Sequence, residues 1–414
     1  MFYGWINVGL FFIMALFTWG PQYSFGVFFK PLATEFNWTR AETSGAMTLN
    51  MIIGGALGML GGLMSDRYGP RKVMMASAML IGIGYLFLSR LAAIWHLYLW
   101  YGLFVGMGMS CAYIVPAATI SRWFVARRGL GLGITLMGMS FAQILVPPVV
   151  ALVIAGSGWR NAYLLMGITV LVLVNLLAAF IRKSPEDYGL YPDGRPPSAA
   201  TDLPGNNGPL EGFTIGQCIK LPVFWLVFMV WILMALPAFL TLVHVVPLAS
   251  DAGIGMVAAA MILSIIGIAG IGGRFLFGYA CDRWGCRASA AIGIGITAAA
   301  MIAMALADRA SLFYTAAVFF GLGYTGSDTA MVKLSGDFFG RRFIGVIMGL
   351  LGLGWRIGAS LGALAGGVIF DLTGKYQASF LVGAFSALVA VSLIFVIFRH
   401  QPQLASAIAA EARC

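Results

Sequence analysis

The sequence predicts an all-α membrane protein with twelve transmembrane helices arranged as two pseudo-symmetric six-helix bundles. Three observations support this fold class. Hydrophobic residues make up 60% of the 414 residues and charged residues only 10%, whereas a soluble domain usually has about a quarter charged residues. Apolar runs of about 20 residues, long enough to cross a bilayer, recur along the whole chain. Sequence patterns of the first half also return in the second half.

Twelve apolar segments follow one another from the N-terminus. The first is too long for a cleavable signal peptide and shows no small-residue cleavage site, so we interpret it as a true first span. The expected spans cover residues 6–29, 43–65, 72–92, 97–121, 128–155, 160–182, 221–249, 256–280, 287–307, 311–336, 343–370 and 376–398.

One long polar stretch separates the sixth span from the seventh. It contains Pro, Gly, Asn and acidic residues, which is the composition of a linker. We therefore expect an N-terminal six-helix bundle at 1–182, a cytoplasmic linker at 183–220 and a C-terminal six-helix bundle at 221–414.

The net charge of +10 does not indicate nucleic-acid binding, because the basic residues form short clusters between spans. Clusters on alternate loops are the positive-inside pattern, which predicts that this side and both termini are cytoplasmic. Charges on the opposite side are isolated, for example Lys30 and Arg40. The basic clusters are Arg67, Arg71 and Lys72; Arg122, Arg127 and Arg128; Arg182 and Lys183; Arg283 and Arg287; and Arg341 and Arg342.

The residue types needed for enzyme chemistry are scarce. The five cysteines are scattered without a CxxC pair, and only three His and fifteen acidic residues are present. We therefore expect no metal, no cofactor and no enzymatic activity. The sequence contains no nucleotide-binding loop, so an ion or solute gradient would have to drive any transport. We expect a monomer surrounded by membrane lipid.

Two motifs of the first half are repeated in the second half in the same order. Two six-span halves with a site between them are a common plan of secondary transporters. The first motif, Gly54-x3-Gly58-x3-Gly62-x3-Asp66-Arg67-x-Gly69-x-Arg71, returns as Gly270-x3-Arg274-x3-Gly278-x3-Asp282-Arg283-x-Gly285-x-Arg287; the second, Arg127-Arg128-x2-Gly131-x6-Gly138, returns as Arg341-Arg342-x2-Gly345-x6-Gly352.

The first of these motifs resembles the loop between the second and third spans of the major facilitator superfamily. Its glycines allow close helix approach. Asp66 and Asp282 are expected at cytoplasmic helix ends, where a carboxylate can face the positive N-terminus of a helix from the other half. The resemblance assigns a conformational role to Asp66, Arg67, Arg71, Asp282, Arg283 and Arg287.

A narrower resemblance is to the monocarboxylate transporter and oxalate/formate antiporter group, in particular to its prokaryotic members. It implies an Arg in the eighth span, and Arg274 stands there. The chain departs from eukaryotic members at Gly270, where they place an acid, and at Tyr23, where they place a Lys. The matching segments are Ser24-Phe25-Gly26-Val27-Phe28-Phe29-Lys30, Trp123-Phe124-x2-Arg127-Arg128-x2-Gly131-x-Gly133, and Ser184-Pro185-Glu186-Asp187-x-Gly189-x2-Pro192-Asp193-Gly194.

Three charged residues lie deep in predicted spans: Arg274, Asp328 and Arg356. A charge at such a depth costs about 2.5–3.5 kcal/mol on translocon scales, which favours a functional role. In the repeat they stand where the first half has Gly58, Tyr113 and Ala142. The charges are thus confined to the second half, and Arg356 and Asp328 can alternatively form a structural ion pair. Lys333 is interpreted as a solvated or structural charge.

Guanidinium groups bind carboxylates through two parallel hydrogen bonds, so Arg274 and Arg356 predict an anion site. Asp328 is a candidate for proton coupling, and His244 for gating or proton transfer. The polar candidates that could complete the substrate site are Tyr113, Tyr23, Gln22 and Tyr324.

The sequence therefore predicts a secondary active transporter that moves small organic anions by alternating access. A proton-coupled symporter of lactate-like monocarboxylates is slightly favoured over an exchanger of oxalate-type dicarboxylates. A non-transporting membrane sensor is a more remote alternative. A cationic-drug exporter would need a buried acid without two buried Arg, and a membrane enzyme would need a catalytic constellation that the sequence lacks.

Overall fold

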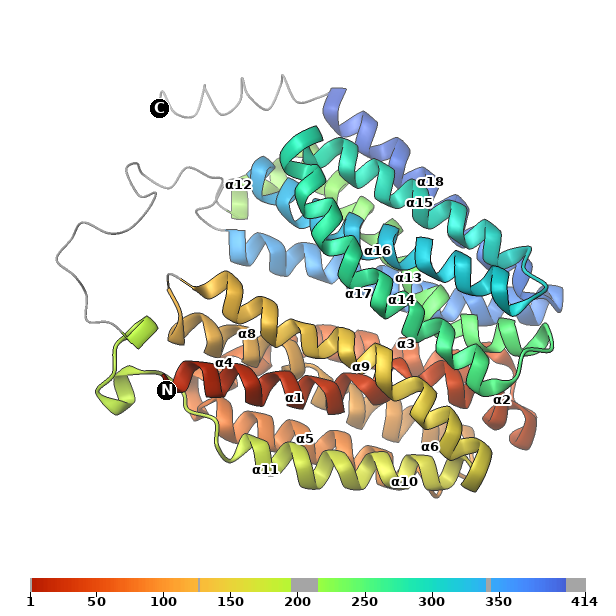
Figure 1. Cartoon of the computed structure of the whole chain (residues 1–414), viewed down its shortest axis with the longest axis horizontal. Coiled ribbons are helices and arrows are strands. Elements are labelled where there is room, and N and C mark those ends of the chain that lie inside the picture. The colour runs from red at the N-terminus through yellow and green to blue at the C-terminus, as the bar shows by residue number, and fades with distance from the viewer. Residues whose placement is uncertain (1, 126, 195–214, 340–343, 400–414) are drawn as a thin grey trace. The chain divides into compact units, whose positions relative to one another are not determined.

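The computed structural model describes residues 2–125, 127–194, 215–339 and 344–399, and within these ranges it contains helices but no strand (Figure 1). The all-α prediction is therefore confirmed. The middle of the linker, Arg341, Arg342 and the C-terminus lie outside the described residues.

Helices coincide with all twelve predicted spans. Before the linker these are α1 (Tyr3–Tyr23), α2 (Phe25–Phe36), α3 (Arg40–Ala56), α4 (Gly58–Tyr68), α5 (Pro70–Leu88), α6 (Ile94–Leu97), η1 (Tyr98–Val105), α7 (Gly106–Met109), α8 (Cys111–Trp123), α9 (Arg128–Ser157), α10 (Trp159–Thr169), η2 (Val170–Val174) and α11 (Asn175–Ala178). The later elements are η3 (Glu186–Tyr188), η4 (Pro192–Gly194), α12 (Ile215–Lys220), α13 (Pro222–Asp251), α14 (Met256–Trp284), α15 (Cys286–Ala305), α16 (Ala310–Phe339), α17 (Ile344–Thr373) and α18 (Tyr376–Arg399).

Most of these helices are suited to a membrane. Among the described residues, ten are long and apolar enough to cross one, or eleven if the bent pair α3 and α4 forms one span. The remaining predicted span is α16, which is 30 residues long and carries Asp328, Lys333 and Asp337. The chain is therefore a multi-pass membrane protein.

The described chain forms two compact units. Unit 1 contains the helices before the linker together with Leu242–Gly267 and Ala363–Gly374. Unit 2 contains α12, the first part of α13, Ile268–Gly362 and α18. The units thus divide α13, α14 and α17 within their length. The boundaries predicted for the two six-helix bundles remain a prediction.

Unit 1 has an aromatic core. Phe28 stacks on Tyr163 with ring centroids 3.9 Å apart, and Phe25 stacks on Tyr101 at 4.6 Å. Tyr85 lies beside both tyrosines, and all these side chains are at most 2% exposed. Offset stacking of this kind adds to the stabilisation from burial, so this core fixes α2, α5, η1 and α10 against one another.

Two prolines within spans leave backbone carbonyls without their usual helical partners. Pro148 has no N–H for the carbonyl of Ile144, and the Ser264 hydroxyl donates to that carbonyl at 2.6 Å in unit 1. Pro237 likewise frees the carbonyl of Leu233, to which Ser386 donates at 3.1 Å in unit 2. In a membrane such carbonyls need a protein partner, because no water reaches them.

The start of the linker is folded onto unit 1. The Arg182 carbonyl accepts hydrogen bonds from Asn7 and Trp123, both at 3.1 Å. The Asp193 carboxylate accepts from the backbone N–H of Val125 at 2.9 Å and of Arg127 at 3.4 Å. The linker therefore begins as an ordered segment that caps the start of α9.

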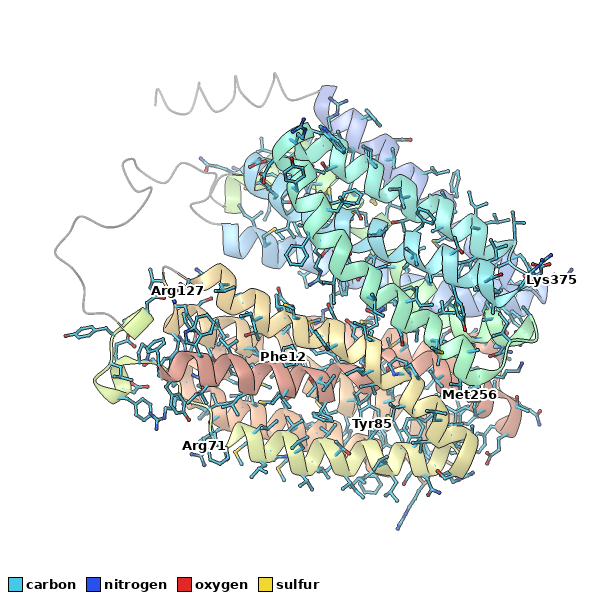
Figure 2. All side chains as sticks on the ribbon, in the orientation of Figure 1. Phe12, Arg71, Tyr85, Arg127, Met256 and Lys375 are labelled. Atoms are coloured by element: carbon cyan, nitrogen blue, oxygen red, sulfur yellow. The ribbon has the colours of Figure 1, made fainter. Side chains whose placement is uncertain are left out.

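The labelled residues of unit 1 distinguish its two ends. Arg71 and Arg127 lie at one end, and Met256 lies at the other (Figure 2). We call the end that holds Arg71 and Arg127 the basic end, and the opposite end the far end.

Candidate functional site

Arg274 lies on a helix that packs very closely against α16 in unit 2. A methyl group at Gly270 would lie 2.9 Å from Cγ2 of Thr325, and one at Gly273 would lie 2.6 Å from the carbonyl oxygen of Leu322. Only glycine fits at such distances. We call this contact the α14–α16 seam.

The side chain of Arg274 leaves this seam and is exposed. Helical geometry places residue 274 about 40° from Gly270 and 100° from Gly273, at the edge of the packed face. A guanidinium that faced lipid at this depth would be costly. The arrangement can therefore present the guanidinium to water or to a ligand.

Asp328 is an acidic residue of the same unit that is affected by the charge of Arg274. It lies on α16, partly buried, and the charged group that acts on its carboxylate is the Arg274 guanidinium. Among the described residues no ion pair joins Asp328 to Arg356, the structural alternative considered from sequence. The structural ion pair between Asp328 and Arg356 is therefore not formed in the described chain.

Arg356 lies on α17 in unit 2 and is partly buried. The flanking glycines pack on α13: a methyl group at Gly358 would lie 2.1 Å from the Ile232 carbonyl oxygen, and one at Gly354 would lie 3.1 Å from Phe228. Two residues correspond to about 200° around a helix. Arg356 therefore lies on the face of α17 opposite to its contact with α13.

Tyr324, also in unit 2, lines a small internal cavity of about 10 Å³. Thr297, Ser327 and Pro237 line the same cavity. This volume is about the minimum that one water molecule needs, and the lining residues offer several oxygen atoms. The cavity can hold one water molecule but not a substrate.

The predicted site residues of unit 1 fall into two groups. Tyr113 is 45% exposed and Tyr23 is partly exposed. Gln22, in contrast, is 2% exposed and bound within the unit: its Nε2 donates to Asn50 at 2.9 Å, and its Oε1 accepts from Tyr101 at 3.3 Å. The Gln22 amide is therefore already engaged in a buried network.

His244 lies at the far end of unit 1 and is fully buried. Its Nε2 is 2.8 Å from the Ala363 carbonyl oxygen, and its ring packs on Phe29 at 5.2 Å. A methyl group at Gly366 would lie 2.1 Å from the imidazole ring. These contacts support a packing role between α13 and α17.

The repeated loop has the same backbone shape in both copies. Gly69 and Gly285 have φ values of 86° and 85°, a region that favours glycine. Asp66 pairs with Arg122 on α8, and Asp282 pairs with Lys333 on α16. Both acids thus bind a cation within their own unit, whereas the expected contact with a helix of the other half remains a prediction. The basic residues of these loops are exposed, namely Arg67, Arg71, Arg283 and Arg287.

The sequence interpretation missed a charged cluster at the far end of unit 1. Lys30 and Arg40, interpreted as isolated, lie 3.1 and 3.5 Å from Asp251. Asp371 accepts the backbone N–H groups at the start of α3. A signal was present, because Lys30 and Arg40 come from the first half and Asp251 and Asp371 from the second.

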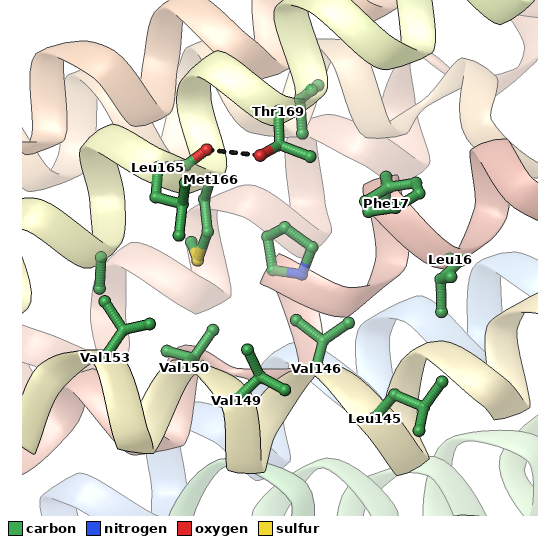
Figure 3. Close-up of a pocket in the computed structure, with 13 residues that line it drawn as sticks. Leu16, Phe17, Leu145, Val146, Val149, Val150, Val153, Leu165, Met166 and Thr169 are labelled. Carbon is green, nitrogen blue, oxygen red and sulfur yellow. Dashed lines mark hydrogen bonds between the residues drawn. The ribbon is translucent and has the colours of Figure 1, made fainter.

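Unit 1 also has an apolar cavity of about 250 Å³, bounded by α1, α9 and α10 (Figure 3). Phe17, Val149 and Met166 line it, and the one hydroxyl shown, that of Thr169, donates to the Leu165 carbonyl at 2.7 Å. The cavity has no charged lining residue. It is therefore unsuited to an anion.

Comparison with known proteins gives consistent matches over nearly the whole chain. The profile described as Major Facilitator Superfamily matches residues 11–310 and 273–413. Monocarboxylate transporter 11 of Homo sapiens is 27% identical over 415 residues, covering 95% of this chain and 82% of that protein. The oxalate:formate antiporter of Oxalobacter formigenes is 24% identical over 387 residues, covering 92% of this chain and 88% of that protein.

A solved structure with a similar fold is that of a bacterial homolog of the human lysosomal transporter Spinster, in an inward-facing and occupied conformation. Its TM-score is 0.75 at 16% sequence identity, with 96% of this chain and 97% of that chain covered. At this identity the likeness concerns the fold.

Proposed function

The chain belongs to the Major Facilitator Superfamily, and from this premise we propose that it transports small organic anions, with lactate-like monocarboxylates favoured, in symport with protons. Members of this superfamily are membrane transporters and not enzymes. The names of two relatives, a monocarboxylate transporter and an oxalate:formate antiporter, support an organic anion as substrate.

The observation that carries the proposal is the exposed Arg274 guanidinium within a membrane-spanning helix. A bound carboxylate would compensate its charge through two charge-assisted hydrogen bonds. Lys cannot reproduce this planar two-point contact. Arg274 is therefore the proposed anchor of the substrate.

Asp328 supplies the proposed link to protons. When its carboxylate is ionised it partly neutralises Arg274, on which it acts electrostatically, and it repels an incoming anion. Protonation of Asp328 leaves the guanidinium free to bind the substrate carboxylate. One proton and one monocarboxylate would then bind together, which is the stoichiometry of an electroneutral symporter.

We propose further that the basic end is cytoplasmic, with both termini on that side of a bacterial inner membrane. The clustered Arg and Lys residues of the loops support this orientation. The contributions of Tyr113, Tyr23, Gln22 and Tyr324 to substrate binding, and of His244 to gating, remain predictions.

The test uses purified Arg274→Lys and Arg274→Ala, each confirmed as monodisperse and helical. Lactate binding is measured by titration, and uptake is measured in proteoliposomes with and without an inward proton gradient. We expect both variants to lose most of the affinity. Wild-type binding and uptake by folded Arg274→Lys would refute Arg274 as the anchor. A sensor, the remote alternative, would move no substrate even as the wild-type protein.

Exchange of dicarboxylates is the second candidate function, and Arg356 favours it. Arg356 is a second partly buried guanidinium, and no ion pair among the described residues includes it. A diacid could bind both arginines. Faster uptake of oxalate than of lactate, lost in Arg356→Ala, would replace the monocarboxylate assignment and leave the anion assignment in place.

A further inference from the structure

The Thr325 hydroxyl joins the two helices of the α14–α16 seam. Thr325 Oγ1 lies 2.6 Å from the Gly270 carbonyl oxygen on α14 and 2.9 Å from the Gly321 carbonyl oxygen on its own helix. In an α-helix the carbonyl of residue 270 is also the acceptor for the N–H of residue 274. The Thr325 hydroxyl therefore meets α14 at the turn that carries Arg274.

The same residue is close to the acid on the other side of the seam. Asp328 follows Thr325 by three residues, so the two lie on neighbouring positions of one helix face. A hydrogen bond at Thr325 thus ties the turn before Arg274 to the turn before Asp328.

The equivalent seam of unit 1 lacks this connection. Ser110 occupies the position of Thr325 in the repeat, and its hydroxyl donates to Met107 of its own segment at 2.6 Å. The positions equivalent to Arg274 and Asp328 are Gly58 and Tyr113 there. The hydrogen bond between the two helices is therefore found in the second copy, which also contains the charged residues Arg274 and Asp328.

We infer that Thr325 is a positioning residue that sets the register of Arg274 against Asp328, an inference that rests on the proposed function. Glycine contacts bring the helices close, but they do not fix how far one slides along the other. The hydroxyl fixes that sliding, and with it the separation of guanidinium and carboxylate.

The test compares Thr325→Val, which keeps the shape and loses the hydroxyl, with Thr325→Ser, which keeps the hydroxyl. Thr315→Val is the matched control, because the Thr315 hydroxyl bonds only to Ser311 of the same helix in the structure, at 3.0 Å. Lactate affinity and the pH profile of uptake are measured on folded protein. We expect Thr325→Val to lose about three- to tenfold in affinity and to shift the pH profile, with both properties preserved in Thr325→Ser and Thr315→Val.

Equal impairment of Thr325→Val and Thr325→Ser would mean that the packing of the whole side chain matters and not the hydrogen bond by itself, which overturns the inference. A wild-type affinity and pH profile in Thr325→Val overturns it as well. If Arg274→Ala also binds normally, the proposed function itself has failed. If only Arg274→Ala loses binding, the positioning role of Thr325 fails alone.

An independent set of contacts, the far-end charge cluster of Lys30, Arg40, Asp251 and Asp371, points to a second device in unit 1. Both carboxylate oxygens of Asp371 accept from the start of α3, at 2.9 Å from the Arg40 N–H and 2.7 Å from the Ala41 N–H. Helix starts leave several N–H groups without partners and attract anions. A residue of α17 thus completes the N-terminus of α3.

Arg40 is the centre of this cluster. Its guanidinium carbon lies 5.5 Å from the Phe29 ring centroid and 5.0 Å from that of Phe370. Its side chain is only 14% exposed, which strengthens its pairing with Asp251. Nearby, a methyl group at Gly367 would lie 2.5 Å from the Arg40 carbonyl oxygen, so the backbones of α3 and α17 almost touch.

We propose that the far-end charge cluster is a latch that holds α2 and α3 against α13 and α17 and releases when this end opens during transport. Two cations come from the first half of the chain and two anions from the second. The four charges neutralise one another while the contacts are formed. When the contacts separate, each charged group must be hydrated instead. The cluster would thus set how easily this end opens.

The test replaces Val243 by Cys as a probe, because Val243 is 1% exposed and lies against Gly26 at this end. The other described cysteines are buried, and Cys414 is replaced by Ser. Labelling by a water-soluble maleimide is compared in detergent for Asp371→Asn and for the control Asp308→Asn, whose exposed carboxylate pairs with the adjacent Arg309.

We expect Asp371→Asn to raise the labelling rate about fivefold, since two charge-assisted hydrogen bonds are weakened. Asp308→Asn should leave the rate unchanged. Asp251→Asn, which neutralises the carboxylate that pairs with both Lys30 and Arg40, should also raise the rate. Equal rates in Asp371→Asn and Asp308→Asn, or a wild-type rate in Asp251→Asn, would overturn the latch.

Discussion

The two copies of the repeated motif pack their helices with opposite choices of residue size. In unit 1, Gly61 on α4 faces Cys111 on α8, and a methyl group at Gly61 would lie 2.8 Å from the Cys111 sulfur. In unit 2, the equivalent pair is Phe277 on α14 and Gly326 on α16, and a methyl group at Gly326 would lie 2.3 Å from the Phe277 ring. The small residue has changed sides while the contact has been kept.

The two copies also differ in backbone continuity. In unit 1 the second span breaks at Leu57, where α3 and α4 are bent by 51°. The equivalent helix of the second half, α14, continues without a break from Met256 to Trp284. The comparison indicates that the repeat preserves glycine contacts and loop shape, whereas helix continuity and charge have diverged. We relate the intact helix to the need to hold Arg274 in a fixed place.

The largest effect is expected from Arg274→Gly. This substitution gives the second copy the residue type that the first copy has at the equivalent position, Gly58. Removal of the guanidinium should reduce lactate affinity by about a hundredfold, because a bidentate charged contact is lost. Isothermal titration of folded protein measures the change. The matched control is Arg309→Gly, which removes an exposed arginine from a loop and should bind lactate as wild type does.

Asp328→Asn erases the other charge and should affect coupling more than binding. The amide stays neutral at every pH and mimics the protonated acid, so lactate should still bind. Uptake should no longer increase with an inward proton gradient, whereas exchange of internal for external lactate should continue. Gradient-driven uptake at the wild-type level would show that Asp328 does not carry the proton.

The exchange of residue sizes can be tested by stability. Gly326→Ala should lower the free energy of unfolding by about 1–3 kcal/mol, because the methyl group has no room against Phe277. Gly278→Ala on α14 should change it by less than about 0.5 kcal/mol, since nothing lies within 4 Å. Thermal unfolding in detergent gives both values.

A double variant sharpens this comparison. Phe277→Gly with Gly326→Cys copies the pair found in unit 1, and it should be more stable than Phe277→Gly alone. If the double variant is no more stable than that single variant, the two seams are not equivalent in packing.

The smallest effect is expected at the paired loop acids. Asp66 and Asp282 are 61% and 69% exposed in their side chains, and each pairs with one cation. Exposed ion pairs contribute about 0–1 kcal/mol. Arg122→Ala and Lys333→Ala should therefore shift the unfolding temperature by only a degree or two, and by similar amounts.

Much of the fold could be predicted from sequence, because membrane spans need long apolar runs and the repeat relates one half to the other. Arg274 could be predicted in the same way, since it interrupts a row of glycines. Which arginine acts electrostatically on Asp328 could not, because this depends on the rotation of α16 about its axis. Gln22 shows the same difficulty, since its buried network involves residues up to 79 positions away.

The far-end charge cluster was missed for a related reason. Arg40 and Asp371 are 331 residues apart in sequence, and each is an ordinary loop charge by composition. The docking of the linker start on α9 was also missed, because its Pro, Gly and acidic residues are typical of a flexible segment. In both cases the information lies in tertiary contact and not in local pattern.

The serine hydroxyls that meet proline-freed carbonyls constrain the order in which these residues can change over evolutionary time. If Pro148 were replaced first, Ile144 would regain its helical partner and Ser264 could then vary freely. If Ser264 were lost first, a buried carbonyl would be left without its donor at 2.6 Å. One order of substitution is therefore nearly neutral and the reverse order is costly, so lineages should lose the proline before the serine. The same asymmetry should hold for Pro237 and Ser386.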